Sequence, residues 1–224
     1  MKNIITIVKK DLKLEFRKRE SLTSMLFFGI LVLVILNIAI GIGQNIAPSI
    51  SGGILWVAVI FAAVLGLDRV FSNEKENRCI DGLLLSPIEP ETIFIAKMAV
   101  NLIFMIIVEL IIIPIFIVLY NSSITLENLP MFIAIVLLLN IGFSAVGTLL
   151  SAISSGTRRN DIMLPILLFP ILIPLIAATV KATSELLSGS PVEKYSQWLY
   201  LTLAFDLIFF GSSYLLFEHV IKEG

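Results

Sequence analysis

The sequence predicts an all-α, polytopic membrane protein with six transmembrane helices. Hydrophobic residues make up 58% of the 224 positions and charged residues only 15%, a balance outside the range of soluble domains. Residues 21–67 contain no charged side chain over 47 positions, and residues 128–157 contain none over 30. Only lipid can face so much apolar surface.

The composition also excludes several other classes of protein. Cys79 is the single cysteine, so the chain is not a disulfide scaffold. Its 16 Lys and Arg residues nearly balance 17 Asp and Glu residues, so no basic surface for nucleic acid is expected.

Residues 1–21 predict an amphipathic helix at the membrane surface. Ile4, Val8, Leu12 and Phe16 recur every four residues and would form its apolar face. The cations that point elsewhere include Lys9, Lys13 and Arg17. Two interpretations remain open: an anchor to anionic lipid, or a lever that also contacts a cytoplasmic partner.

The apolar stretches that follow divide into six lengths of roughly 20 residues, which is what a bilayer core about 30 Å thick requires. The first uncharged run is too long for one span, and the turn-forming residues between Gly41 and Gly53 predict a hairpin of two helices. The membrane domain covers 22–217, with spans near 22–42, 52–71, 93–119, 129–153, 162–182 and 197–217, and is followed by a cytoplasmic tail at 218–224.

The distribution of Lys and Arg predicts that both termini are cytoplasmic. With the N-terminus inside, all but Lys181 and Lys194 of the 16 cations fall on the cytoplasmic side. The first apolar stretch follows a long charged segment and lacks an evident cleavage site, so we expect a retained span and no signal peptide.

The inner loop at residues 68–92 carries an apolar cluster that a plain connector would not need. Ile80 and Leu83 to Leu85 follow a charged stretch, and Ser86-Pro87 ends the run. This pattern predicts a short cytoplasmic helix within segment 74–90, whose apolar face would dock on a membrane surface or in a protein groove.

The run from Glu74 to Ile88, followed by Ile95-Ala96-Lys97, resembles the ATPase-coupling loop of type-2 ABC exporter permeases. The order of acidic residue, acidic-plus-glycine turn, leucine cluster, Ser-Pro and Lys is similar, although the family's Gly-Thr-Leu-Glu is Cys79-Ile80-Asp81-Gly82 here. The resemblance implies that ATPase coupling involves Glu74, Arg78, Ile80, Asp81, Gly82, Leu83, Leu84, Leu85, Ser86 and Pro87.

More narrowly, the chain is similar to the haem exporter B family of bacterial cytochrome c maturation. The similar runs are 47–50 leading to 53–58, 67–71 and the proline-rich 164–175. The resemblance implies a permease of the bacterial inner membrane, with haem as a possible substrate and ATP hydrolysed by a separate cytoplasmic ABC ATPase subunit. The other implied partners are a second permease copy, a haem-handling membrane protein, a small single-span helper and a periplasmic haem chaperone.

The residues themselves show neither an ATP site nor a haem or metal site. The sequence has no G-x-x-x-x-G-K-[ST] run to hold a triphosphate, so we expect no ATPase activity in this chain. His219 is the only histidine, and we interpret it as a solvated residue near the C-terminus. Cys79 is interpreted as a small residue of the coupling helix.

Glu109 and Asp206 lie inside the third and sixth spans, where a charged carboxylate is costly unless paired or hydrated. Protonation or a hydrogen bond would relieve that cost, and we favour a structural hydrogen bond over a proton relay or a haem-iron site. The expected donors are Asn37, Asn101, Asn140 and Ser144.

Two further patterns concern helix shape and packing. Proline removes a helix donor, and kinks are therefore predicted at Pro114, Pro165, Pro170 and Pro174. Ala58, Ala62 and Gly66 form a small-residue stripe that predicts close helix packing, preferably within one subunit.

Other functions remain open at this stage. A proton-driven secondary transporter would use Glu109 and Asp206 but leaves the coupling helix unexplained. An assembly factor that remodels a membrane complex, or another type-2 ABC exporter permease, would need the same coupling helix.

Overall fold

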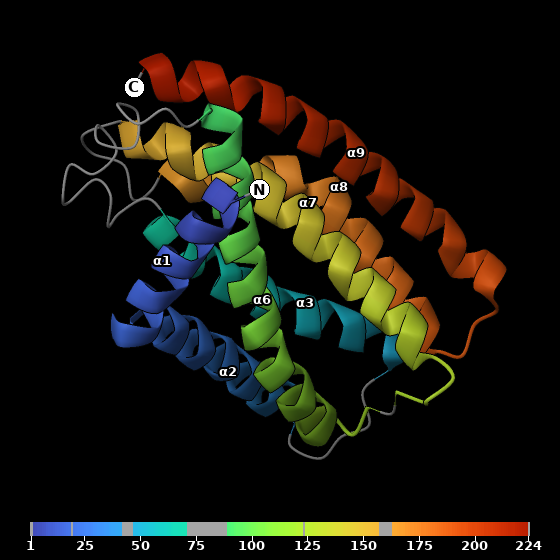
Figure 1. Cartoon of the computed structure of the whole chain (residues 1–224). Helices are drawn as coiled ribbons and strands as arrows, with labels where there is room; N and C mark the ends of the chain where they lie inside the picture. The colour runs from blue at the N-terminus through green and yellow to red at the C-terminus, as the bar shows by residue number, and fades with distance from the viewer. Residues whose placement is uncertain are drawn as a thin grey trace.

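The computed structural model describes residues 2–18, 20–41, 47–70, 89–122, 124–156 and 163–223. Every regular element in these residues is an α-helix (Figure 1). In chain order the helices are α1 (Lys2–Lys18), α2 (Glu20–Ile40), α3 (Pro48–Val70), α6 (Pro90–Tyr120), α7 (Leu129–Gly156), α8 (Met163–Leu187) and α9 (Val192–Glu223).

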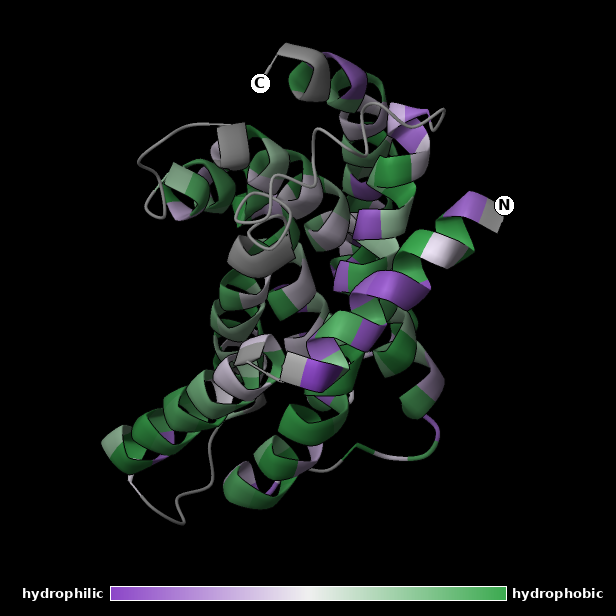
Figure 2. Ribbon diagram, turned by 60° about the vertical axis from the view of Figure 1, so that its left-hand side comes forward, coloured by the Kyte–Doolittle hydropathy of each residue, from purple (hydrophilic) through white to green (hydrophobic). Residues whose placement is uncertain are grey.

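Six of these helices, α2, α3 and α6 to α9, are long and apolar enough to cross a membrane. Their ribbons are hydrophobic over most of their length, whereas hydrophilic residues are frequent on α1 (Figure 2). The predicted all-α polytopic membrane protein with six spans is therefore confirmed. The division into domains stays a prediction.

Helix α3 begins earlier than the turn-forming residues suggested. Pro48 occupies its first position, where a missing N–H costs nothing, and the carbonyl of Ala47 accepts from the N–H groups of Ile50 at 2.9 Å and Ser51 at 3.2 Å. The helix thus starts four residues before the predicted span at 52–71, and Gly52 lies inside it. A Cβ at Gly52 would lie 2.7 Å from Ser184 Oγ on α8, so this glycine allows the close approach of two helices.

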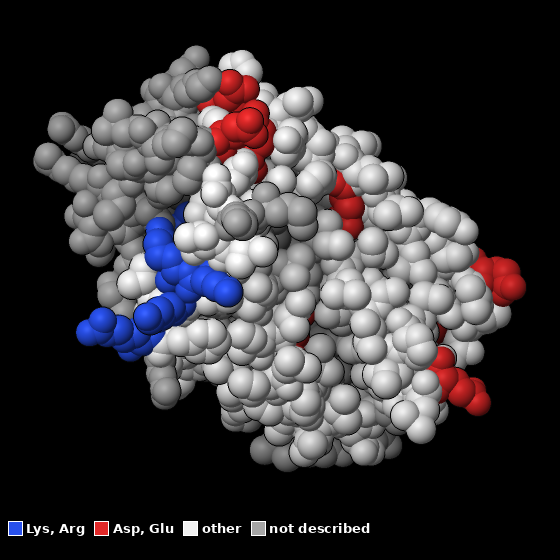
Figure 3. Space-filling view, viewed as in Figure 1, with Lys and Arg blue, Asp and Glu red and all other residues white. Residues whose placement is uncertain are grey.

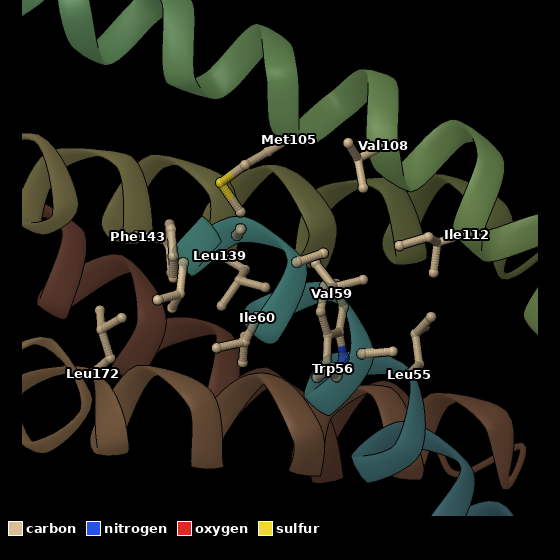
Figure 4. Packing of buried hydrophobic residues seen from close by; sticks show 14 of the residues in the cluster. Leu55, Trp56, Val59, Ile60, Met105, Val108, Ile112, Leu139, Phe143 and Leu172 are labelled. Carbon is tan, nitrogen blue, oxygen red and sulfur yellow. The ribbon is translucent and has the colours of Figure 1, made fainter. Parts of the chain in front are cut away.

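Helix α3 is the centre of the bundle, and 72% of the 18 residues from Ile50 to Leu67 are buried. Figure 4 shows its side chains between α6 on one side and α8 on the other. The fully buried Trp56 donates its indole N–H to Thr183 Oγ1 of α8 at 2.8 Å. The other labelled residues of this core are Leu55, Val59 and Ile60 of α3, Met105, Val108 and Ile112 of α6, Leu139 and Phe143 of α7, and Leu172 of α8.

The small residues of α3 contact α2 within the same chain. A Cβ at Gly66 would lie 2.6 Å from Met25 Sδ, and one at Gly29 would lie 3.3 Å from Ala62 Cβ. Both the α2–α3 hairpin and the packing of this stripe inside one subunit are confirmed at these positions.

The prolines differ in position along their helices. Helix α6 continues through Pro114, and α8 continues through Pro170 and Pro174, where kinks stay predictions. Pro165 is the third residue of α8. The kink predicted at Pro165 stays a prediction as well.

Candidate functional site

The predicted coupling residues, from Glu74 to Pro87 and including Cys79, lie outside the described residues. The structure describes what joins that segment on its C-terminal side. Glu89 is the N-cap of α6, and Pro90 stands at its first position. Of the candidate coupling site, the structure therefore describes only the contacts that the start of α6 makes.

Helix α1 packs against the N-terminal end of α6, and a buried ion pair joins the two. Lys97 Nζ lies 2.9 Å from Asp11 Oδ2, with the two side chains only 2% and 10% exposed. Asp11 also pairs with Lys10, whose side chain is 43% exposed, at 3.1 Å through Oδ1. A chain of charges thus runs from solvent at Lys10 to the buried Lys97.

The face of α1 that packs on the protein carries Glu15 and not Phe16. Phe16, expected on the apolar face, is 51% exposed, whereas Glu15 is only 6% exposed. A step of four residues overshoots a 3.6-residue turn by about 40°, so Phe16 has rotated by about 120° from Ile4. Glu15 is within about 20° of Ile4 by the same geometry and lies on the buried face.

The buried Glu15 holds the junction between α1 and α2. Its Oε1 accepts the backbone N–H groups of Ser21 at 2.8 Å and Leu22 at 3.4 Å, in the first turn of α2. A carboxylate there satisfies free donors and complements the helix dipole. Asp11 and Glu15 were not among the predicted site residues, although two acidic residues one turn apart in a basic helix were a usable signal.

The predicted basic residues of α1 are on the surface. Lys9, Lys13 and Arg17 are exposed, and Figure 3 shows the visible Lys and Arg side chains gathered over α1 at one end of the molecule.

The start of α6 is also bound to α9 by an aromatic cluster. Phe94 is fully buried, and its ring centroid lies 5.3 Å from that of Phe217, 6.2 Å from that of Phe210 and 6.4 Å from that of Tyr214. These separations are typical of stabilising aromatic pairs. Because Phe94 and Lys97 are one turn apart, the same end of α6 contacts both α1 and α9.

Buried polar residues that follow Lys97 on α6 form hydrogen bonds across the interface of α6 and α7. Asn140 Nδ2 donates to Glu109 Oε2 at 2.6 Å, and Asn101 Nδ2 donates to Ser144 Oγ at 3.3 Å. The Ser144 hydroxyl in turn lies 3.7 Å from Met105 Sδ. We call these contacts the polar seam; it consists of Asn101, Met105 and Glu109 on α6 with Asn140, Ser144 and Thr148 on α7, all at most 2% exposed, and Lys97 lies one turn before Asn101 on α6.

One of the four expected donors, Asn140, therefore contacts a membrane carboxylate. Asn101 and Ser144 bond to each other, and Asn37 donates instead to the carbonyl of Leu119 at 3.0 Å. Whether Glu109 has a functional or only a structural role stays a prediction.

Asp206, near the middle of α9, is 4% exposed and lies against Gly142 of α7. A Cβ at Gly142 would collide with Asp206 Oδ1, so the glycine makes the room for the carboxylate. Neither oxygen of Asp206 has a hydrogen-bond partner in the described part of the chain. Asn140 and Gly142 are about 200° apart around α7, so Asp206 and Glu109 lie on different sides of this helix.

The described residues contain no group of three or more His, Cys, Asp or Glu side chains that could hold a metal ion. His219 is exposed near the end of α9.

Known proteins resemble this chain over nearly its full length. The family model described as CcmB protein matches residues 2–215. "Heme exporter protein B" of Pseudomonas aeruginosa is 24% identical over 200 residues, which cover 89% of this chain and 89% of that protein. The protein of the same name from Rhodobacter capsulatus is 27% identical, with 75% of this chain and 76% of that protein covered. The one from Haemophilus influenzae is 25% identical, with 77% of each covered. With 214 of its 224 residues inside the family match and six helices able to span a membrane, this chain belongs to the CcmB protein family.

Proposed function

We propose that the chain is the permease subunit of an ABC transporter complex that exports or delivers haem for c-type cytochrome biogenesis. The observation that carries this proposal is the family match over residues 2–215, together with relatives named heme exporter protein B that align over most of both chains. The absence of a P-loop in the sequence supports ATP hydrolysis by a separate cytoplasmic ATPase subunit.

The proposed location is the bacterial inner membrane, with both termini in the cytoplasm. The charge distribution supports this orientation, because cationic segments resist translocation. Lys and Arg gather over α1 at one end, whereas the charged side chains visible where α6 joins α7 and α8 joins α9 are acidic (Figure 3).

The proposed partners are those of a cytochrome c maturation complex. Besides the ATPase, they are a second permease copy, a haem-handling membrane protein, a small single-span helper and a periplasmic haem chaperone.

In this proposal the ATPase acts on segment 74–90, which leads directly into α6. A push on that segment reaches Phe94 and Lys97 within the first two turns of α6. The aromatic cluster and the Asp11 ion pair would then pass the displacement to α9 and α1. The interfacial helix thus acts as a lever as well as an anchor.

Leu84→Glu tests the coupling role. One charge in an apolar docking groove is expected to abolish co-purification of the ATPase, because desolvating an unpaired carboxylate outweighs a small apolar contact. Holo-cytochrome c should be lost in cells whose only copy of the permease carries this change. Leu84→Met is the matched control and should retain both. Wild-type ATPase retention by Leu84→Glu would refute the coupling assignment, and normal holo-cytochrome c in cells without the permease would refute the function itself.

A further inference from the structure

The polar seam contains several buried polar atoms that have no hydrogen-bond partner in the described part of the chain. In the described residues, no hydrogen bond reaches Glu109 Oε1, Asn140 Oδ1, Asn101 Oδ1 or Thr148 Oγ1. All four side chains are at most 2% exposed. Buried polar atoms in proteins almost always have partners, so four orphaned atoms along one helix interface call for a ligand.

The geometry of the seam arranges these atoms in a line. Asn101 and Glu109 are eight residues apart on α6, and Asn140 and Thr148 are eight residues apart on α7. The bonds from Asn140 to Glu109 and from Asn101 to Ser144 fix the two antiparallel helices in register. The orphaned atoms are therefore spread along about two turns of both helices. They are not collected at one point.

Water is the ligand that suits such a line. Buried waters typically make about three hydrogen bonds to otherwise unsatisfied groups, and water both donates to carbonyl and carboxylate oxygens and accepts from a hydroxyl. A single cation would satisfy acceptors around one centre and would leave the remaining atoms of the line without partners.

The seam has a polar end and an apolar end. At the polar end Lys97 is linked through Asp11 to the exposed Lys10. Past the bond between Glu109 and Asn140, the next buried residues are apolar: Ile112 and Phe116 on α6, and Phe132, Ile135 and Leu139 on α7. At the far end of α6, the buried Tyr120 donates its hydroxyl to the carbonyl of Leu33 on α2 at 2.7 Å.

We propose that the seam between α6 and α7 is a one-sided water path that enters beside the Asp11–Lys97 ion pair and ends at the Glu109 carboxyl. The path hydrates a carboxyl that would otherwise be buried in an apolar bundle, and it lets that group exchange its proton with one side of the membrane only. This inference does not depend on haem as a substrate or on the presence of an ATPase.

Four other ionisable groups on α1 and α9, which also pack against α6, have the following contacts and positions. Asp11 pairs with Lys97 and Lys10, and Glu15 accepts from the first turn of α2. On α9, Asp206 lies against Gly142, on a different side of α7, and Glu218 belongs to the last turns of that helix. In the described part of the bundle, the hydrogen-bond partner of Glu109 is thus the neutral Asn140.

Two matched pairs of cysteine variants test the path in a Cys79→Ser background. Ser144→Cys lies on the seam, and Ala145→Cys is its neighbour at the same depth in a separate apolar cluster, with both wild-type residues 0% exposed. On α6, Glu109→Cys marks the end of the path, and Val108→Cys is its neighbour in the apolar core. The probe is the silver ion, a soft cation that binds thiolates.

Membrane vesicles carrying each variant are exposed to silver nitrate from one face, quenched, and denatured, and the remaining free thiol is titrated with a fluorescent maleimide. Lys13→Cys, on the exposed surface of α1, identifies the face that carries the polar end. We expect loss of the free thiol in Ser144→Cys and Glu109→Cys from that face only, with Ala145→Cys and Val108→Cys protected.

Protection of Ser144→Cys and Glu109→Cys from both faces would overturn the proposal. Equal reaction of the seam and control positions would overturn it as well, because the water would then not be confined to the seam. Reaction at Ser144→Cys without reaction at Glu109→Cys would refute the claim that the path ends at Glu109. Reaction from the opposite face alone would refute the side of the membrane from which the path is proposed to open.

Discussion

At the scale of single residues, Lys97 shows how a charge can lie in the bundle interior. The ion pair with Asp11 compensates its burial, so removal of Lys97 leaves the largely buried Asp11 with the half-exposed Lys10 as its remaining ion-pair partner. Lys97→Met is therefore expected to lower the free energy of unfolding by about 3–5 kcal/mol. The double variant with Asp11→Asn should recover much of that loss, and Lys13→Met, at an exposed position of α1, should change little. Thermal unfolding of the purified variants in detergent measures these differences; equal stability of Lys97→Met and Lys13→Met would show that the pair contributes nothing.

Glu109 tests the role of a membrane carboxylate in a different way. Glu109→Gln keeps an oxygen that can accept from Asn140 Nδ2 and remains able to bind water. Holo-cytochrome c yield in cells with only this variant is expected to stay near normal, whereas Glu109→Leu, which loses the hydrogen bond, should reduce it. A collapse with Gln despite normal membrane insertion and normal ATPase co-purification would contradict the structural role and favour a proton-driven mechanism.

At the scale of helices, the contact of α7 with α9 depends on Gly142. Gly142→Ala would place a Cβ against Asp206 Oδ1 and 2.9 Å from Leu175 Cδ2. Overpacking of this kind costs about 1–3 kcal/mol, so the melting temperature should fall. Gly211→Ala on α9 is the matched control, because a Cβ there meets nothing within 4 Å, and it should be neutral or stabilising. If both variants melt alike, α7 and α9 do not approach each other closely at Gly142.

The sequence predicts the helices far better than it predicts their partners. Length and hydropathy are local properties, and they were sufficient for six spans and for the α2–α3 hairpin. On α1, a four-residue repeat only approximates a helix turn, so it did not show that Glu15 packs on the protein. The membrane contact of Phe16 stays a prediction. The donor that meets Glu109 depends on the register of α6 against α7. That register is a tertiary property, and it brings Asn140 to Glu109 but Asn37 to the carbonyl of Leu119.

At the scale of the whole molecule, the basic surface and the contacts at the start of α6 lie at the same end of the bundle. The basic surface of α1, the Asp11–Lys97 pair, the aromatic cluster around Phe94 and the entry of segment 74–90 all meet at the start of α6. The opposite end carries the α6–α7 connection, where Leu126 is 86% exposed. The proposed orientation therefore puts the mechanical contacts on the cytoplasmic side and leaves Leu126 outside.

Labelling of single cysteines in intact cells tests this orientation. In a Cys79→Ser background, Leu126→Cys is expected to react with a membrane-impermeant maleimide added outside, because its loop lies beyond the bilayer. Lys13→Cys should react only after the cells are permeabilised, since α1 carries the cations that resist translocation. Both positions are exposed, so a difference between them reports the side of the membrane and not burial. The reverse pattern would place α1 and segment 74–90 outside, where no ATPase could reach them, and would refute both the topology and the proposed coupling.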